Sequence, residues 1–259
     1  MNFTATGLGL MVFYFALTAL APFALSHPRL LVSQPRLCLT LWKITFTLAA
    51  FTITTSLGLF IALALRHHVI HVPGHDSLAP FIDQILGWLA IGIVGVLAFR
   101  MGASVQDART AVSQMNGEFR MVLAGSRVLR VNEQDISVIE SSIPMVGARA
   151  GRVVATSAMI EKLTSTQLEI VVEHERSHIQ RHHSRDIAVA NIAEAIAPAL
   201  TAGKGFASAA RITTELIADD DAARVFGNRE TADAILTAYP LEPGVSERAE
   251  RLLASALTL

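Results

Sequence analysis

Apolar residues dominate the first hundred positions and form three runs, each long enough to cross a bilayer. The runs cover about residues 3–25, 37–65 and 78–99, and a helix needs about 20 apolar residues to span the hydrocarbon core. Lys43 lies near the start of the second run, where its long side chain can reach the membrane surface. The pattern predicts a transmembrane domain at residues 1–100 with three spanning helices.

The first apolar run must be compared with a cleaved signal peptide. Ala24-Leu25-Ser26 loosely resembles a cleavage site. The leader before the run has no basic residue, however, and the run exceeds the apolar core of about 7–15 residues that signal peptides have. We therefore expect a retained membrane span.

Basic residues are distributed unevenly between the loops. Arg29, Arg36 and Lys43 lie between or at the edges of the first two runs, Arg66 lies between the second and third, and Arg100 and Arg109 follow the third. Because cytoplasmic loops carry an excess of Lys and Arg, we expect the N-terminus outside and residues 101–259 in the cytoplasm. This describes a multi-pass protein of the plasma or inner membrane.

The second loop is rich in histidine, with imidazoles at positions 67, 68, 71 and 75. Such a cluster could bind a metal or respond to pH. A polar loop at the membrane surface explains the same residues, and we favour that interpretation.

The charge balance changes after residue 100. The chain is 52% hydrophobic and only 17% charged, yet 17 basic and 20 acidic residues fall within positions 100–259, which is close to the composition of a soluble domain. The near-neutral balance argues against a nucleic-acid-binding surface. A single cysteine, Cys38, excludes a disulfide framework and a cysteine-type zinc site.

The polar part begins with a pattern typical of a helix over residues 100–114. Residues 119–131, with apolar and polar positions alternating around residues 127–131, predict short strands, and residues 152–156 after Gly151 form the clearest strand candidate. Thr166 and Glu169 have the spacing of a capping box, which predicts the start of a helix.

The predicted helix carries His174-Glu175-Arg176-Ser177-His178, the pattern H-E-x-x-H. Residues i and i+4 lie on one face of a helix, so His174 and His178 can bind one metal ion. Glu175 then lies beside that ion, where it can take a proton from a bound water. Zinc suits this chemistry because it polarises a carbonyl and lowers the pKa of its water to about 7.

A second predicted helix supplies carboxylates. Glu215 can complete a His-His-Glu ligand set, and Asp219, one turn later, can hold the other nitrogen of a ligand imidazole. Asp220 and Asp221 are alternatives for the role of Asp219. Between the two motifs, residues 187–203 are rich in Ala and Ile, and we expect a buried or interfacial helix there rather than a fourth span.

These residues resemble the BlaR/MecR-like M56 family of membrane zinc metallopeptidases. The resemblance rests on the three apolar runs, on Arg152 to Ile179 with the H-E-x-x-H pattern, and on Glu215 to Ala223 with its E-x-x-x-D pattern. HtpX-like and CAAX-protease-type gluzincins share the same core pattern. The resemblance implies a mainly α membrane protein, with three N-terminal transmembrane helices followed by a small α+β, gluzincin-like zinc metalloprotease domain at residues 101–259.

The same resemblance implies roles for individual residues. His174, His178 and Glu215 would bind one catalytic Zn²⁺, Glu175 would act as general base, and Asp219 would orient a ligand. The strand containing Val153, Val154 and Ala155 would lie at the rim of the cleft, where an extended substrate could add as an extra strand. The chain shows no serine-lysine acylation motif and no penicillin-binding sensor domain, so sensing of an antibiotic by acylation is not expected.

The expected reaction is hydrolysis of a peptide bond, with Glu175 passing a proton from water to the leaving amine. The donor that stabilises the negative intermediate stays open among His182, His183, Arg211, Arg224 and Tyr239.

By analogy with the resembled family, the substrate is a cytoplasmic, repressor-type regulator or the protease itself. The alternatives are an HtpX-like quality-control protease for membrane proteins and a non-catalytic metal-binding membrane receptor. The expected partners are a protein substrate and the lipid bilayer, with no direct nucleic acid; a homo-oligomer is left open.

Overall fold

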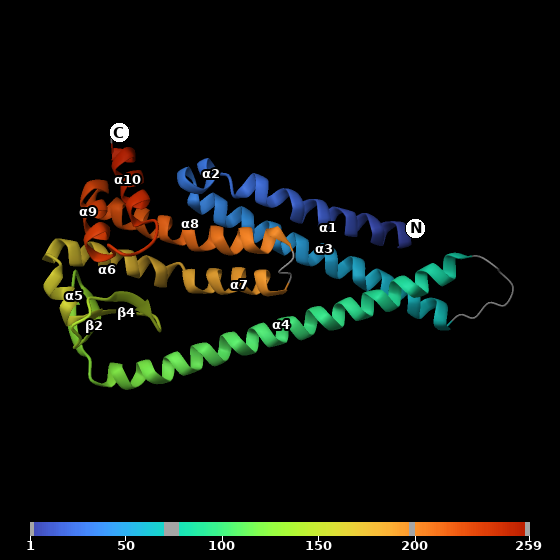
Figure 1. The fold of residues 1–259 in the computed structure, drawn as a ribbon, viewed down its shortest axis with the longest axis horizontal. Coiled ribbons are helices and arrows are strands. Elements are labelled where there is room, and N and C mark those ends of the chain that lie inside the picture. The colour runs from blue at the N-terminus through green and yellow to red at the C-terminus, as the bar shows by residue number, and fades with distance from the viewer. Residues whose placement is uncertain (1–2, 70–77, 197–199, 257–259) are drawn as a thin grey trace. The chain divides into compact units, whose positions relative to one another are not determined.

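The computed structural model describes residues 3–69, 78–196 and 200–256, and gives only the backbone at 67–69, 78–80, 108–109 and 111–124. Helices make up most of it, and one small sheet follows the apolar helices in the chain (Figure 1). The chain folds into two compact units. The first comprises residues 1–31, 37–107 and 189–209, and the second comprises residues 32–36, 108–188 and 210–259.

Three helices in the N-terminal part are long and apolar enough to cross a membrane. They are α1 (Phe3–Leu25), α3 (Pro35–Val69) and α4 (Leu78–Ala124), and their apolar stretches cover Phe3–Leu25, Pro35–Arg66 and Phe81–Asp107. A short helix, α2 (Pro28–Ser33), lies between α1 and α3. The predicted number and position of the apolar helices are confirmed; the histidine-rich loop lies at or beyond the edge of the described residues.

Helix α4 is longer than the sequence pattern predicts. It continues without interruption to Ala124, and the first strand starts only at Arg127. The prediction of strand structure from residue 119 is therefore wrong for residues 119–124. The segment from Arg100 to Ala124 contains no proline, and the helix continues through Asn116-Gly117, a pair that often ends helices, so that the first break comes at Gly125-Ser126.

The first unit has its own apolar core. Leu57, Phe60 and Leu63 of α3 pack with Ala90 of α4. Gly87 brings the two helices close together, because a Cβ atom there would lie 2.9 Å from the Phe60 carbonyl oxygen.

The alanine-rich stretch after residue 187 does not form one helix. It is divided between α7 (His183–Ile196) and α8 (Thr201–Phe226), and residues 189–209 cluster with the apolar helices. Phe206 of α8 stacks on Trp42 of α3, with ring centroids 5.8 Å apart. A single boundary near residue 100 therefore does not describe the compact units, because apolar side chains of α8 pack with those of α3.

The second unit contains a four-stranded sheet with the order β1-β2-β4-β3. Its strands are β1 (Arg127–Val131), β2 (Gln134–Ile139), β3 (Val146–Arg149) and β4 (Arg152–Thr156). β1 and β2 are antiparallel, β2 and β4 are parallel, and β3 and β4 are antiparallel. β4 is thus an interior strand.

The position of β4 corrects the predicted substrate edge. Val154 pairs with Ser137 on one side and Gly147 on the other, and Ala155 also has partners on both sides. Val153 pairs with Ala148 of β3. A strand whose hydrogen-bonding groups are already paired cannot accept an additional strand, so the prediction that a substrate adds along this strand is wrong for Val154 and Ala155.

The helices of the second unit pack on this sheet and on one another. They are α5 (Ser157–Lys162), α6 (Ser165–Gln180), α9 (Asn228–Ala238) and α10 (Val245–Ala256), together with parts of α7 and α8. α6 contacts the sheet and α9, and α10 packs on α9. Buried Ile136, Met159 and Val171 belong to the shared core.

The N-terminus of α6 differs from the predicted one by two residues. Thr164 is the N-cap and forms a capping box with Gln167, in which both reciprocal hydrogen bonds are present. Thr166 and Glu169 therefore lie inside the helix. Both pairs have the spacing of a capping box, and the backbone becomes extended at Thr164, which decides between them.

Candidate metal centre

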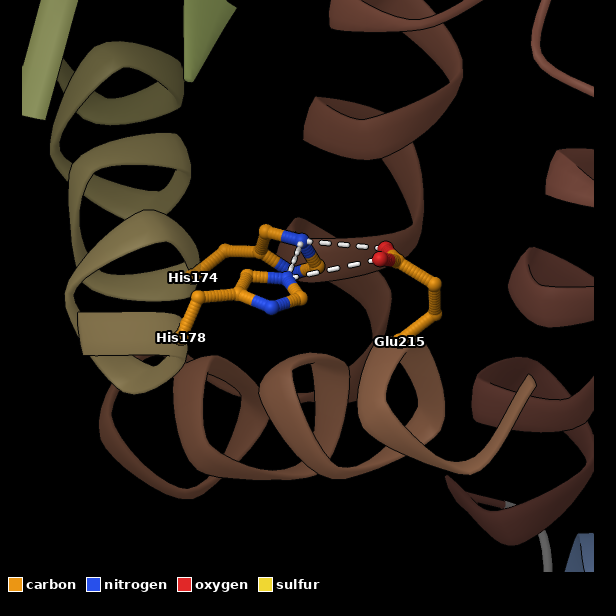
Figure 2. A group of neighbouring side chains, drawn as sticks. All are labelled: His174, His178 and Glu215. Atoms are coloured by element: carbon orange, nitrogen blue, oxygen red, sulfur yellow. Dashed lines mark hydrogen bonds and ion pairs between the residues drawn. The ribbon is translucent and has the colours of Figure 1, made fainter. Parts of the chain in front are cut away.

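Two imidazoles and one carboxylate converge between helices α6 and α8. His174 and His178 point from α6 toward Glu215 of α8 (Figure 2). The Nε2 atoms of the two histidines are 3.2 Å apart. They lie 3.4 and 3.5 Å, respectively, from the two carboxylate oxygens of Glu215, and the three ligand atoms lie within 4.8 Å of one another.

The helices that carry this group are fixed by ordinary packing. His174 and His178 share one face of α6 because they are one helical turn apart. The same helix is anchored in the core by buried Ile170 and Val171, which lie one to two turns before the histidines. The structure thus brings together the three residues that the sequence predicts as ligands.

Asp219 holds the far side of the His174 ring. Its Oδ1 lies 3.0 Å from His174 Nδ1, and its side chain is completely buried. Arg248 of α10 donates two hydrogen bonds to it, from Nε at 2.8 Å and from Nη2 at 2.7 Å. Burial alone would raise the pKa of the Asp219 carboxyl, but the hydrogen bonds from Arg248 and the contact with His174 hold it well below its usual range.

The two neighbouring carboxylates have different partners. Asp220 pairs with Arg251 at 2.6 Å. Asp221 accepts a hydrogen bond from Ser177 at 2.7 Å and pairs with three arginines, Arg36, Arg181 and Arg224. Of the three consecutive aspartates, Asp219 is the one that contacts a histidine of the centre.

The charges around His174 favour a cation at this place. Burial lowers the pKa of the His174 imidazole, but its contacts with Asp219 and Glu215 outweigh burial and raise the pKa to about 10. Burial would raise the pKa of the Glu215 carboxyl, but His174, His178 and Arg248 outweigh burial and lower it to about 2. A protonated His174 therefore supplies the positive charge that a bound metal ion would supply at this group of carboxylates.

The donor set fits zinc. Two imidazole nitrogens and a carboxylate oxygen are the ligands of many catalytic zinc sites, which leave one position for water or substrate. Glu215 is 29% exposed whereas His174 is 2% exposed, so solvent reaches the group on the Glu215 side. His174, His178 and Glu215 could therefore hold an ion that remains accessible to a substrate.

Glu175 is buried beside the centre, close enough for its charge to act on both imidazoles. Tyr239, just after α9, donates a hydrogen bond from its hydroxyl to Glu175 Oε1 at 2.7 Å. Burial and the charge of Glu175 raise the pKa of Tyr239 well above its usual value, so the hydroxyl keeps its proton. Tyr239 thus fixes one oxygen of Glu175.

His183, at the first position of α7, lies against His178. Its Nδ1 is 3.0 Å from His178 Nδ1, and the two rings are nearly perpendicular, at 84°. Burial, followed by the neighbouring His178, lowers the pKa of His183 to about 3. The ring is therefore neutral at physiological pH.

His182, Arg211 and Arg224 were also proposed as donors to the negative intermediate. None of the interactions described above joins them to His174, His178 or Glu215. Arg224 pairs with Asp221, and His182 is exposed in the turn before α7. Arg211 is exposed one turn before Glu215. Tyr239 and His183 are the two candidates that the structure brings to the centre.

Arg248 and Glu242 are functional-site residues that sequence reasoning missed. Besides Asp219, Arg248 contacts Glu215 Oε2 at 3.1 Å and Glu242 Oε2 at 3.4 Å. The buried positions of α10 are Val245, Arg248, Ala249 and Leu252, which is the apolar spacing of an amphipathic helix. The sequence could have indicated Arg248, because an arginine among the apolar positions of a helix must be paired with an opposite charge when the helix packs.

Comparison with known proteins supports a peptidase. Residues 138–237 match the profile of Peptidase family M48, and this range includes both histidines, Glu175, Glu215 and Asp219. The chain is also similar to the Plastoglobule-localized metallopeptidase 48, chloroplastic, of Arabidopsis thaliana, at 26% identity over 126 residues. The aligned part is 47% of this chain and 34% of the relative, so the chain spans about a third of that protein.

No solved structure matches the chain. The finer resemblance to BlaR/MecR-like M56 proteins is not confirmed, because the matched profile is that of M48. The H-E-x-x-H pattern occurs in several families and does not separate them. The part of the chain that carries the candidate centre is similar to the M48 peptidases, which supports a metallopeptidase domain within residues 138–237.

Proposed function

We propose that this protein is a membrane-embedded zinc metalloendopeptidase. The observation that carries the proposal is the convergence of His174, His178 and Glu215 within 4.8 Å, with Glu175 buried beside them. Three helices long and apolar enough to span a membrane precede this domain. The M48 match supports the same class of enzyme.

His174, His178 and Glu215 would hold the zinc ion, and Asp219 would fix the ring of His174. Zinc, when bound, polarises a carbonyl and lowers the pKa of its water to about 7. Glu175 would accept the proton of that water and pass it to the leaving amine. The hydrogen bond from Tyr239 holds one Glu175 oxygen, leaving the other free for this transfer.

The protease domain would face the cytoplasm, because most basic residues of the short loops lie on the side of the first loop and of the segment after Arg100. A cytoplasmic, repressor-type regulator or the protease itself is the proposed substrate. This part of the proposal depends on the resemblance stated from the sequence.

Quality control of membrane proteins is the second candidate. The matched profile is that of M48, and a candidate metal centre that follows apolar helices in the chain is compatible with this role. A defined product from one regulator would support the first substrate class. Accumulation of many misfolded membrane proteins in cells that lack the activity would support the second.

The central experiment separates metal binding from catalysis. In purified full-length protein, we expect Glu175→Gln to retain zinc while peptide hydrolysis falls by about 10²–10⁴-fold, the usual contribution of a general base. His174→Ala should lose the zinc. Glu169→Gln, which changes a glutamate of the same helix outside the centre, is the matched control and should keep both properties.

Undiminished hydrolysis by Glu175→Gln would contradict the mechanism. Zinc in the wild type without peptidase activity, in several detergents and lipids, would favour a non-catalytic metal-binding receptor. The natural substrate can then be sought by comparing the proteomes of cells that carry the wild type and Glu175→Gln.

A further inference from the structure

The His183 ring has a single polar partner among the residues that the structure describes. That partner is His178, which it meets at 3.0 Å through Nδ1. The other ring nitrogen, Nε2, is buried and has no hydrogen-bond partner within the described part of the chain. The residue as a whole is only 1% exposed.

Such a ring is costly to bury. An unpaired polar atom in the interior is destabilising, and a leucine would occupy a similar place without that cost. Native proteins tolerate this kind of loss mainly at functional sites. The hydrogen bond to His178 is therefore the one polar contact described for His183 that a leucine could not make.

The backbone brings His183 to this position through a tight reversal. α6 ends at Gln180, Arg181 caps it, and His182 follows with φ of +57°. This left-handed conformation is uncommon for residues other than glycine. It lets α7 start at once, so that a residue five positions after His178 returns to contact it.

The hydrogen bond between the two rings joins two nitrogen atoms and therefore contains one proton. His178 turns Nε2 toward Glu215 and His174, so Nε2 is the atom that would bind the metal. A nitrogen that binds a metal must have its lone pair free, and the proton of His178 must then lie on Nδ1. His183 has to accept that proton's hydrogen bond at its own Nδ1.

We propose that His183 is a positioning residue that fixes the tautomer and the ring orientation of His178 for metal binding. It would do for His178 what the Asp219 carboxylate does for His174, where the ring nitrogen opposite the metal also meets an acceptor. This inference rests on the proposed function, since it takes His178 to be a metal ligand.

Two variants of His183 test the hydrogen bond, and one neighbour provides the control. His183→Leu fills the space but offers no acceptor, whereas the carboxamide oxygen of His183→Asn can accept near the original Nδ1 position. His182→Asn removes an exposed imidazole one residue away and tolerates the left-handed backbone. All three are made in the full-length protein and purified without metal.

The measurements are the zinc dissociation constant, by competition with a chelating dye, and the thermal unfolding midpoint of the metal-free form. We expect His183→Leu to weaken zinc binding by about 10–100-fold while its metal-free midpoint is unchanged or higher. His183→Asn should recover most of the affinity, and His182→Asn should bind zinc like the wild type.

Wild-type zinc affinity in His183→Leu would overturn the proposal. So would a lowered metal-free midpoint in His183→Leu together with no recovery in His183→Asn, because that combination describes a packing role. Either result leaves the peptidase proposal intact if the wild type binds zinc and Glu175→Gln is inactive. A wild type that binds no zinc would instead remove the proposed function itself.

Discussion

Arg248 connects three carboxylates at the centre. It makes two hydrogen bonds to Asp219 and contacts Glu215 and Glu242. Opposing charges at these distances raise the pKa of the Arg248 guanidinium although burial would lower it. Without this cation, the metal-free centre would contain a fully buried aspartate beside a second carboxylate.

We therefore expect Arg248→Met to destabilise the metal-free protein strongly. Removing one member of a buried ion pair costs about 3–5 kcal/mol, because the remaining charge is left without compensation. Thermal unfolding in detergent measures the effect. Arg224→Met, which removes an arginine that is 60% exposed, should cost no more than about 1 kcal/mol; equal losses in the two variants would contradict the assigned role of Arg248.

Asp221 predicts an acid-sensitive contribution to stability. Burial would raise the pKa of its carboxyl, but the hydrogen bonds from Arg181, Ser177 and Arg224 outweigh burial and lower the pKa to about 2. An unfolded aspartate has a pKa of about 3.9. Because the folded value is the lower one, the stabilisation is fully present above about pH 4 and is lost as the pH falls toward 2.

The corresponding experiment compares the wild type with Asp221→Asn across this pH range. The variant should unfold at a lower temperature at neutral pH, and the difference should shrink between about pH 4 and 2. Asp135→Asn, which changes an exposed aspartate of β2, serves as control. A difference between wild type and Asp221→Asn that does not depend on pH would refute the electrostatic explanation.

At the scale of elements, the sequence pattern predicted which segments form helices more accurately than it predicted the residues at which the helices begin and end. The pattern around His174 predicts α6 because its apolar residues recur with helical spacing, but two overlapping capping boxes fit the start, and Thr164 is the one used. Helix α4 was predicted too short because the strand prediction from the alternation around residues 127–131 was extended back to residue 119. The capping box and the extended backbone at Thr164 mark the start of α6, and helical backbone that continues to Ala124 marks the end of α4.

Close helix packing in the first unit gives an element-scale prediction. A side chain at Gly87 of α4 would collide with Ala64 and with the Phe60 carbonyl oxygen of α3, whereas nothing lies within 4 Å of a Cβ added at Gly92. We expect Gly87→Val to separate the two helices and lower the unfolding temperature in detergent, because small residues allow close approach in such packing. Gly92→Val should leave that temperature nearly unchanged, and a similar loss in both would argue against the contact.

At the scale of the whole molecule, the three apolar helices found in the described part of the chain make a topological prediction. Three spans would place the N-terminus and the C-terminal domain on opposite sides of the membrane, with the basic first loop on the domain's side. Reporters fused to either end should respond in opposite compartments, with the C-terminal one in the cytoplasm. Reporters that respond on the same side would mean an even number of crossings.

The composition of the two compact units also belongs to this scale. Residues 189–209 cluster with the apolar helices although they lie between the two motifs of the candidate centre. The charge distribution along the chain predicts a boundary near residue 100, because it records where polar residues begin. It does not record that Phe206 stacks on Trp42, a contact between positions 164 residues apart in the chain.

The sequence by itself determined the apolar helices, the pairing of His174 with His178, and the candidate carboxylates, since each depends on spacing within one helix or on the length of one run. Helical geometry converts such spacing directly into a shared face. For this reason Glu215 and Asp219 could be proposed together, one turn apart.

Only the tertiary structure decided which groups meet across elements. It selected Asp219 over Asp220 and Asp221, brought Arg248 and Tyr239 to the centre, and placed β4 inside the sheet. These outcomes depend on packing between segments distant in the chain, where burial makes a charge or a hydrogen-bonding group require a partner. A linear pattern contains the candidates for such partnerships, but the folded chain determines the pairs.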